Sequence, residues 1–188
     1  MGKSSSNQHF LKRSMNEISS DYNYLFNVLK LASVHHASQK RKSDNLPYVN
    51  HLIDVADILI EFGNVACEDE IAGALLHDIL EGTDLEMKAL ESQVSEKTLS
   101  IVLSLTDDKA QPLEQRRNVS IRTLTLADNA TKRVKLADMC SNVTAPPLGW
   151  PKKRLHGSYR HSDAIAEICK DASLCLFNEY QNRRLIFC

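Results

Sequence analysis

Residues 74–81 read Ala74-Leu75-Leu76-His77-Asp78-Ile79-Leu80-Glu81, an apolar helical stretch that carries an adjacent histidine and aspartate. Packing alone does not explain this pair, because an aspartate is almost never buried without a partner that offsets the loss of its hydration. A divalent cation is such a partner, and imidazole and carboxylate groups both bind metals. The stretch therefore predicts a metal site on a helix, whose remaining ligands come from elsewhere in the chain.

Length and composition are those of an ordinary globular protein. The 188 residues are 43% hydrophobic and 25% charged, which predicts one folded domain over 19–188 behind a polar, disordered leader over 1–18. The net charge of −1 argues against a general nucleic-acid binder. No apolar run approaches the roughly 20 residues of a membrane span. The five cysteines are scattered without a CxxC pair, which is typical of reduced thiols and a cytoplasmic location.

Apolar residues recur at spacings of three and four, and no useful length of chain alternates as a strand would. The fold class expected is all-α. We expect loops at 40–49, 106–112 and 146–153. Helices are expected from Asp21 to about His36 and at about 50–62, 68–81, 84–92, 95–105, 112–127, 130–144 and 160–183.

Further ligand candidates lie on other predicted helices. His51 begins the helix at 50–62, and Asp138 lies in the helix at 130–144 with Asn142 one turn later, on the same face. Together with His77 and Asp78, these side chains make a mixed nitrogen and oxygen site. Such a site suits manganese, iron or zinc better than calcium.

With this set of residues the sequence resembles the HD-domain metal-dependent phosphohydrolases. The resemblance is closer to the small alarmone hydrolases and the hydrolase domain of Rel/Spo-type enzymes. The resemblance spans about residues 22–180 and implies a helical bundle of about eight to ten helices. It also implies removal of pyrophosphate from the 3′ position of guanosine tetra- and pentaphosphate, with Mn²⁺ as the cofactor. The matching segments are Arg41-Lys42, 47–51, 74–78, 106–109, 134–138 and Asn142.

The resemblance implies that His51, His77, Asp78 and Asp138 are the metal ligands. Glu81 lies three residues beyond Asp78, so we expect it to be the catalytic base for the attacking water. A bis-diphosphate also requires cations. The expected substrate-binding residues are Arg41, Lys42, Tyr48, Asn142, Lys109 and Arg154.

The sequence departs from the family after the His-Asp pair. Relatives usually carry Glu-Asp where this chain has Glu81-Gly82, and often an arginine where it has Thr144. Three explanations of the missing second acid follow. Glu81 alone suffices for catalysis, another acid such as Asp84 substitutes for it, or the protein has changed its substrate or lost its activity. The alternatives are an HD phosphohydrolase for another phosphorylated nucleotide, such as NADPH, and a weakly active or non-catalytic alarmone-binding protein. The partner expected is a nucleotide, without nucleic acid or membrane, and homo-oligomerisation is left open.

Overall fold

The computed structural model describes residues 15–187, so most of the leader expected over 1–18 lies outside the described residues. Within these described residues the secondary structure is helical and contains no strand. Lys40 and Pro47 form an isolated antiparallel bridge. The all-α prediction is confirmed. The helices are α1 Met15–His35, α2 Val49–Glu61, α3 Glu68–Leu76, α4 Ile79–Gly82, α5 Met87–Glu91, α6 Glu96–Leu105, α7 Leu113–Leu126, α8 Asn129–Thr144, α9 Lys152–Cys169 and α10 Leu174–Phe187, with a 3₁₀ turn at Lys170–Ala172 before α10.

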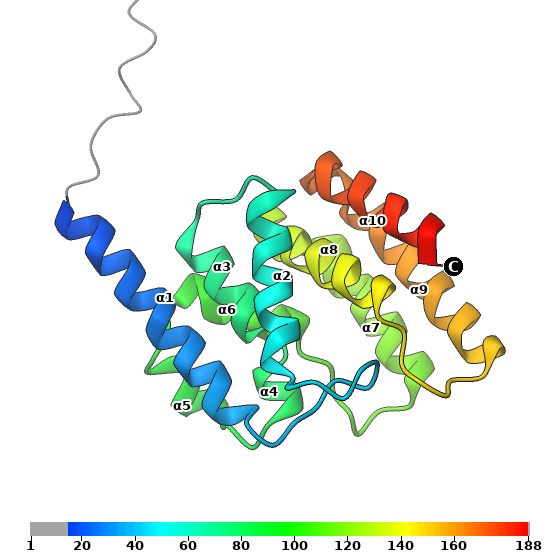
Figure 1. Ribbon diagram of the computed structural model, residues 1–188, viewed down its shortest axis with the longest axis horizontal. Helices are drawn as coiled ribbons and strands as arrows, with labels where there is room; N and C mark the ends of the chain where they lie inside the picture. Colours follow the sequence, from blue (N-terminus) through cyan, green and yellow to red (C-terminus); the bar gives the residue numbers. More distant parts are fainter. Residues whose placement is uncertain (1–14, 188) are drawn as a thin grey trace, which may run out of the picture.

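Helix α8 is the centre of the packing. It runs through the middle of the molecule, with α2 and α3 on one side and α9 and α10 on the other (Figure 1). Helix α8 is buried on several sides, so the polar side chains that it directs inward are removed from water. Its buried residues include Val134, Leu136, Ala137, Asp138, Met139, Cys140, Ser141 and Val143.

The helix expected over 68–81 is interrupted, which corrects the sequence prediction. Helix α3 ends at Leu76, and Asp78 leaves the helical region with φ −104° and ψ 1° before α4 begins at Ile79. This sparsely populated backbone region is common among active-site residues. The break changes the direction of the backbone between His77 and Asp78, so the side chains of two successive residues can reach the same place.

The basic loop before α2 is held in a defined conformation. Its ends are joined by backbone hydrogen bonds from Arg41 N to Leu46 O and from Tyr48 N to Gln39 O, at 2.8 and 3.0 Å. Asn45 takes the left-handed conformation at its tip, with φ 65°, which asparagine tolerates better than most residues. The sequence predicts the loop and its basic character, and the hydrogen bonds add a fixed shape.

The prediction of a single helix over 160–183 is wrong, because two helices cover this range. Helix α9 begins earlier, at Lys152 directly after Pro151, and ends at Cys169. After the 3₁₀ turn, Ser173 is extended, and its hydroxyl accepts a hydrogen bond from Leu176 N at the start of α10. A serine in this position favours a new helix start over continuation of the old one.

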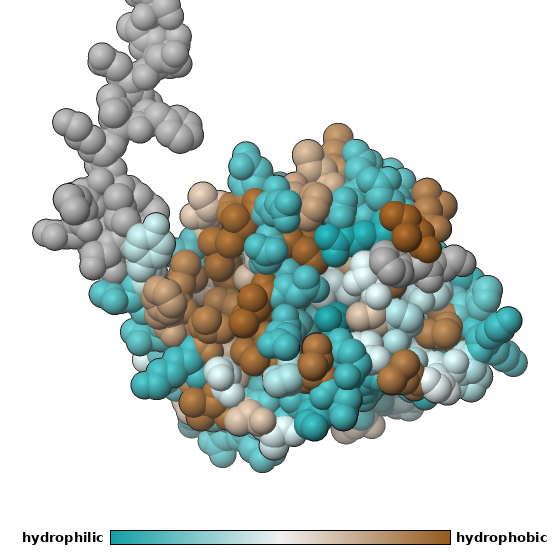
Figure 2. Space-filling model, viewed as in Figure 1, coloured by the Kyte–Doolittle hydropathy of each residue, from teal (hydrophilic) through white to brown (hydrophobic). Residues whose placement is uncertain are grey.

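The other expected helices agree within a few residues, except that α1 extends back to Met15 and α5 is shorter than expected. No helix in the described part of the chain is both long and apolar enough to cross a membrane. Exposed apolar side chains gather over α1 and α2 on the face shown in Figure 2. They include Tyr22, Phe26, Ile53 and Ile60.

Two glycines provide a matched test of the helix packing. A Cβ at Gly73 would lie 2.8 Å from Cγ2 of Ile101, whereas a Cβ at Gly157 would meet nothing within 4 Å. We expect Gly73→Ala to lower the free energy of unfolding by about 1–3 kcal/mol through overpacking of α3 against α6. Gly157→Ala should raise it by about 0.5–1 kcal/mol, because alanine is the better helix former. Urea unfolding of both variants checks this, and equal stabilisation by both would contradict the close α3–α6 packing.

Candidate metal centre

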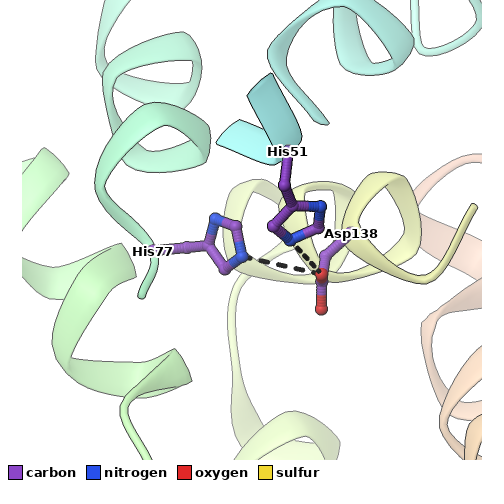
Figure 3. Close-up of side chains that lie close together, drawn as sticks. All are labelled: His51, His77 and Asp138. Atoms are coloured by element: carbon purple, nitrogen blue, oxygen red, sulfur yellow. Dashed lines mark ion pairs between the residues drawn. The ribbon is translucent and has the colours of Figure 1, made fainter. Parts of the chain in front are cut away.

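Three buried side chains from three helices converge on one point. His51 comes from the first turn of α2, His77 follows the last residue of α3, and Asp138 lies in the middle of α8. Nε2 of His51 and Nε2 of His77 lie 3.3 and 3.6 Å from Oδ1 of Asp138 (Figure 3). Neighbouring ligand atoms around one transition-metal ion are about 3.0–3.4 Å apart when each bond is about 2.1 Å. One ligand atom from each of the three residues lies within 4.8 Å of the other two.

The hydrogen bonding of His77 fits metal binding. Its Nδ1 lies 2.8 Å from the carbonyl oxygen of Ala74, which only accepts, so Nδ1 carries the proton. In the neutral ring Nε2 is then an unprotonated lone pair. This atom is buried without a hydrogen bond and lies 3.3 Å from Oδ2 of Asp78 as well as near Asp138. The two carboxylates that face this atom favour a positive charge there, either a proton on Nε2 or a cation that all three groups bind.

Electrostatics around His77 support the same conclusion. Burial alone would lower its pKa, but the carboxylates of Asp78 and Asp138 raise the pKa of His77 well above its usual value. In the metal-free protein a proton on His77 would therefore supply the positive charge. A metal bound there would replace that proton, since an imidazole must be neutral to act as a ligand.

His51 is oriented by a serine that the sequence analysis did not single out. Nδ1 of His51 lies 3.0 Å from the hydroxyl of Ser141, which is fully buried on α8. One Nη atom of Arg41 donates to both the hydroxyl and the carbonyl oxygen of Ser141, at 2.9 and 3.0 Å. Ser141 thus connects the basic loop to the histidine and leaves Nε2 of His51 directed at Asp138. Groups that hold a ligating imidazole in this way also increase its basicity.

We expect Ser141→Ala to weaken binding of Mn²⁺ by about 10–100-fold, because His51 loses the group that orients it. Isothermal titration calorimetry with Mn²⁺ measures this effect. Ser120→Ala changes another serine of the cavity, on α7, and serves as the matched control with unchanged affinity. An unchanged affinity in Ser141→Ala would show that this hydrogen bond does not orient His51.

Asp78 lies beside His77 at the edge of this group. Its carboxylate is 3.3 Å from Nε2 of His77 and accepts a short hydrogen bond from the hydroxyl of Tyr48. Burial would raise the pKa of Asp78, but His77 holds it below its usual range. Asp78 is absent from the group whose ligand atoms all lie within 4.8 Å of one another. Its role as the fourth ligand stays a prediction.

The second oxygen of Asp138 faces a lysine. Nζ of Lys135 lies 2.8 Å from Oδ2, and the side-chain amide of Asn142 donates to Oδ1 at 2.6 Å. Burial opposes ionisation, yet Lys135 and the two histidines hold the pKa of Asp138 well below its usual range. The expected shared face of Asp138 and Asn142 is confirmed by this contact. Asp138 is thus held as a carboxylate, the form that binds metal.

The centre lies in a cavity of about 750 Å³. The residues expected at the site line this cavity, with Arg154 as the exception. Arg154 is exposed on the first turn of α9, and its guanidinium lies 3.9 Å from the ring centroid of Trp150, which does line the cavity. The lining also contains an excess of basic over acidic side chains, a property suited to a polyanion. These basic residues are Lys40, Arg41, Lys42, Lys109, Arg116 and Lys135, against the acids Asp78, Glu81, Asp107 and Asp138.

Glu81 is half-buried at the wall of the cavity, and its carboxylate is not a member of the close metal-binding group. One of its oxygens accepts from the backbone N–H of Asp107 at 3.4 Å, and Nζ of Lys109 lies 3.6 Å from the other. Burial and the nearby Asp78 raise the pKa of Glu81, while Lys109 lowers it. A carboxylate with a raised pKa is a stronger base than a free glutamate.

Several residues of the cavity are not among those predicted from the sequence. Ser141 carries no signal of its own, since a serine on a helix is more often structural. Lys135 and Arg116 are ordinary charged residues in the sequence, and only the fold places both of them on the lining of one cavity. The spacing of Lys135 and Asp138, three residues apart on one helix, is a signal that could have identified their ion pair.

The helical fold and the His, His-Asp, Asp set define an HD domain. The family model described as HD domain matches residues 29–143, a range that contains His51, His77, Asp78 and Asp138. The chain is similar to guanosine-3′,5′-bis(diphosphate) 3′-pyrophosphohydrolases called MESH1. The protein from Danio rerio is 31% identical over 148 residues, which is 76% of this chain and 82% of the relative. That from Drosophila melanogaster is 32% identical over 67% of this chain and 73% of the relative.

This chain belongs to the HD-domain family that includes the MESH1 proteins. A solved structure supports the placement. It is described as a metazoan ortholog of SpoT that hydrolyses ppGpp, and it superposes with a TM-score of 0.80 at 26% identity, over 85% of this chain and 93% of that one. The predicted family is therefore confirmed.

Proposed function

We propose that this protein is a metal-dependent hydrolase that removes the 3′-pyrophosphate from guanosine 3′,5′-bis(diphosphate) and related alarmone nucleotides. The observation that carries the proposal is the buried lone pair of His77, aimed at two carboxylates inside a cavity with a basic wall. The names of the MESH1 relatives and of the SpoT ortholog point to the same reaction.

We infer that His51, His77 and Asp138 hold the metal together with Asp78, and that Mn²⁺ is the resident ion. A divalent ion supplied there would acidify a bound water and polarise a phosphoryl oxygen. The nitrogen ligands suit a transition metal better than Mg²⁺ or Ca²⁺. Choice among manganese, iron and zinc requires measurement of the metal content of protein purified without added metal.

The remaining roles belong to side chains of the cavity wall. Glu81 takes the proton of the attacking water, because its carboxylate lies at the wall without being part of the close ligand group. Lys42 and Lys109 neutralise phosphate charge, and Asn142 positions the ribose. Arg41 is bound to Ser141, so we assign it to orientation of His51 as well as to phosphate. Arg154 lies over Trp150 and is not part of the cavity lining, so its contact with the substrate stays a prediction.

Two measurements test the proposal together. The first is release of pyrophosphate from guanosine tetraphosphate by purified protein with Mn²⁺, beside phosphate release from NADPH. The second uses Trp150, the single tryptophan of the chain, as a fluorescent reporter of ligand entry into the cavity. Pyrophosphate release together with a fluorescence change supports the proposal. Phosphate release from NADPH, without pyrophosphate release from guanosine tetraphosphate, would show that the protein is a metal-dependent hydrolase with a different substrate.

Gly82 favours a second candidate function, that of a protein that binds alarmone nucleotides without hydrolysing them. Gly82 lines the cavity where the family usually supplies a second acid, and it offers no side chain. A fluorescence change with guanosine tetraphosphate, without pyrophosphate release at any Mn²⁺ concentration, would identify that function. The same result would exclude the hydrolase.

A further inference from the structure

His36 is a buried titratable residue to which the proposed function assigns no role. It directly follows the last residue of α1, at the start of the segment that leads to α2, and only 1% of its surface is exposed. Its Nδ1 lies 2.6 Å from Oε1 of Gln39, an amide oxygen that accepts, so Nδ1 carries the proton. Burial lowers the pKa of His36, which keeps the ring neutral. Its orientation and tautomer are therefore determined by Gln39.

The ring of His36 supports the aromatic ring next to the metal centre. His36 and Tyr48 are stacked, with centroids 5.1 Å apart and planes 28° apart. The far end of Tyr48 donates its hydroxyl hydrogen to the carboxylate of Asp78. The other neighbour of the Tyr48 ring is His51, in an edge contact at 5.3 Å. Tyr48 is thus held between two histidines, and its hydroxyl determines where Asp78 points.

Gly82 makes room for this arrangement. A Cβ at Gly82 would lie 3.2 Å from Cε1 of His36 and 3.3 Å from Oε1 of Gln39, closer than most such contacts. The pair therefore packs directly against the backbone at the position where the sequence departs from its relatives. Gly82 and Gln39 both line the cavity, as does Asp78, so the packing of His36 and Gln39 on Gly82 lies at the cavity wall.

We propose that His36, held by Gln39 and packed on Gly82, is a positioning residue that acts through Tyr48 to direct the carboxylate of Asp78 into the metal centre. The proposal rests on the metal site proposed above, and it adds His36, Gln39 and Gly82 as residues that support the ligands without being ligands. His36 contributes its flat ring, and the chemistry requires no proton transfer at this ring. Removal of the ring leaves a gap behind Tyr48, and the hydroxyl then no longer holds Asp78 in one place.

The test measures Mn²⁺ affinity by calorimetry, and kcat and KM for guanosine tetraphosphate, in four variants. His36→Ala is expected to bind Mn²⁺ about 10-fold more weakly, the lower end of effects seen for groups that orient ligands. His36→Phe retains a stacking ring and should stay within about 3-fold of wild type. His35→Ala, the neighbouring and less buried histidine, is the matched control with unchanged affinity. Gln39→Ala should show a smaller loss in the same direction as His36→Ala, and it serves if His36→Ala fails to fold.

A double variant separates positioning from general loosening of the fold. If His36 acts through the Tyr48 hydroxyl, then His36→Ala combined with Tyr48→Phe weakens Mn²⁺ binding no further than Tyr48→Phe alone. Additive losses would overturn the proposal, as would wild-type affinity in His36→Ala or an equally severe loss in His36→Phe. The affinity measurement needs no turnover, so failure of the hydrolase proposal shows as Mn²⁺ binding without pyrophosphate release. Absence of Mn²⁺ binding by wild type would overturn both the metal centre and the role of His36.

Discussion

The His77→Ala variant is expected to lose hydrolysis of guanosine tetraphosphate by about 10³-fold or more, because metal stabilisation of phosphoryl transfer contributes several kcal/mol. The buried Nε2 of His77 lies within 3.6 Å of both Asp78 and Asp138, so its removal leaves two carboxylates without the ring between them. The measurements are pyrophosphate release and Mn²⁺ content after dialysis. Wild-type protein treated with a chelator should lose the same activity and regain it with Mn²⁺, whereas His77→Ala should not regain it.

His156→Ala is the matched control, since His156 is exposed on α9 and does not line the cavity. Its activity should equal that of wild type. His77→Ala also removes a buried side chain, so a thermal melt must show that the variant is folded before its activity is interpreted. Activity close to wild type in folded His77→Ala would refute the assignment of this site as the metal centre.

The Glu81→Gln variant is expected to lower kcat by about 10²–10⁴-fold, the range for removal of a general base. Because glutamine has the same size and also accepts hydrogen bonds, Mn²⁺ affinity should change little. Burial and Asp78 raise the pKa of Glu81, so the fraction of active, deprotonated base falls as the pH falls through that raised value. In wild type the acid limb of the pH–rate profile should therefore lie above the ordinary pKa of glutamate, and it should disappear in Glu81→Gln.

Two variants sharpen this prediction. Lys109→Ala removes a cation that lowers the pKa of Glu81, so the acid limb should move to higher pH, by a small amount because Lys109 is mostly exposed. Asp84→Asn tests whether another acid substitutes for the one that Gly82 lacks. Asp84 is exposed and outside the cavity lining, so we expect no change. A loss in Asp84→Asn comparable to that in Glu81→Gln would show that Asp84, rather than Glu81, is the base.

The sequence predicted the parts of the site whose residue types and local spacing are informative. The adjacent His77 and Asp78 in an apolar helical stretch predicted a compensating cation. The shared helix face predicted for Asp138 and Asn142 is confirmed, and the structure adds a hydrogen bond of 2.6 Å between them. Hydrophobic periodicity, which depends only on nearby residues, was also sufficient for the all-α fold. It did not reveal the break at Asp78, because apolar residues continue on both sides of it.

Taken alone, the sequence determined the fold class, the family and the candidate ligands, since each depends on residue type, local spacing or a recognisable pattern. Tertiary structure alone decided that Ser141 links Arg41 to His51 and that His36 stacks on Tyr48 beside Gly82. These contacts join separate segments of the chain. The partners of a buried polar group depend on what packing brings near it, and that information is distributed over the whole chain.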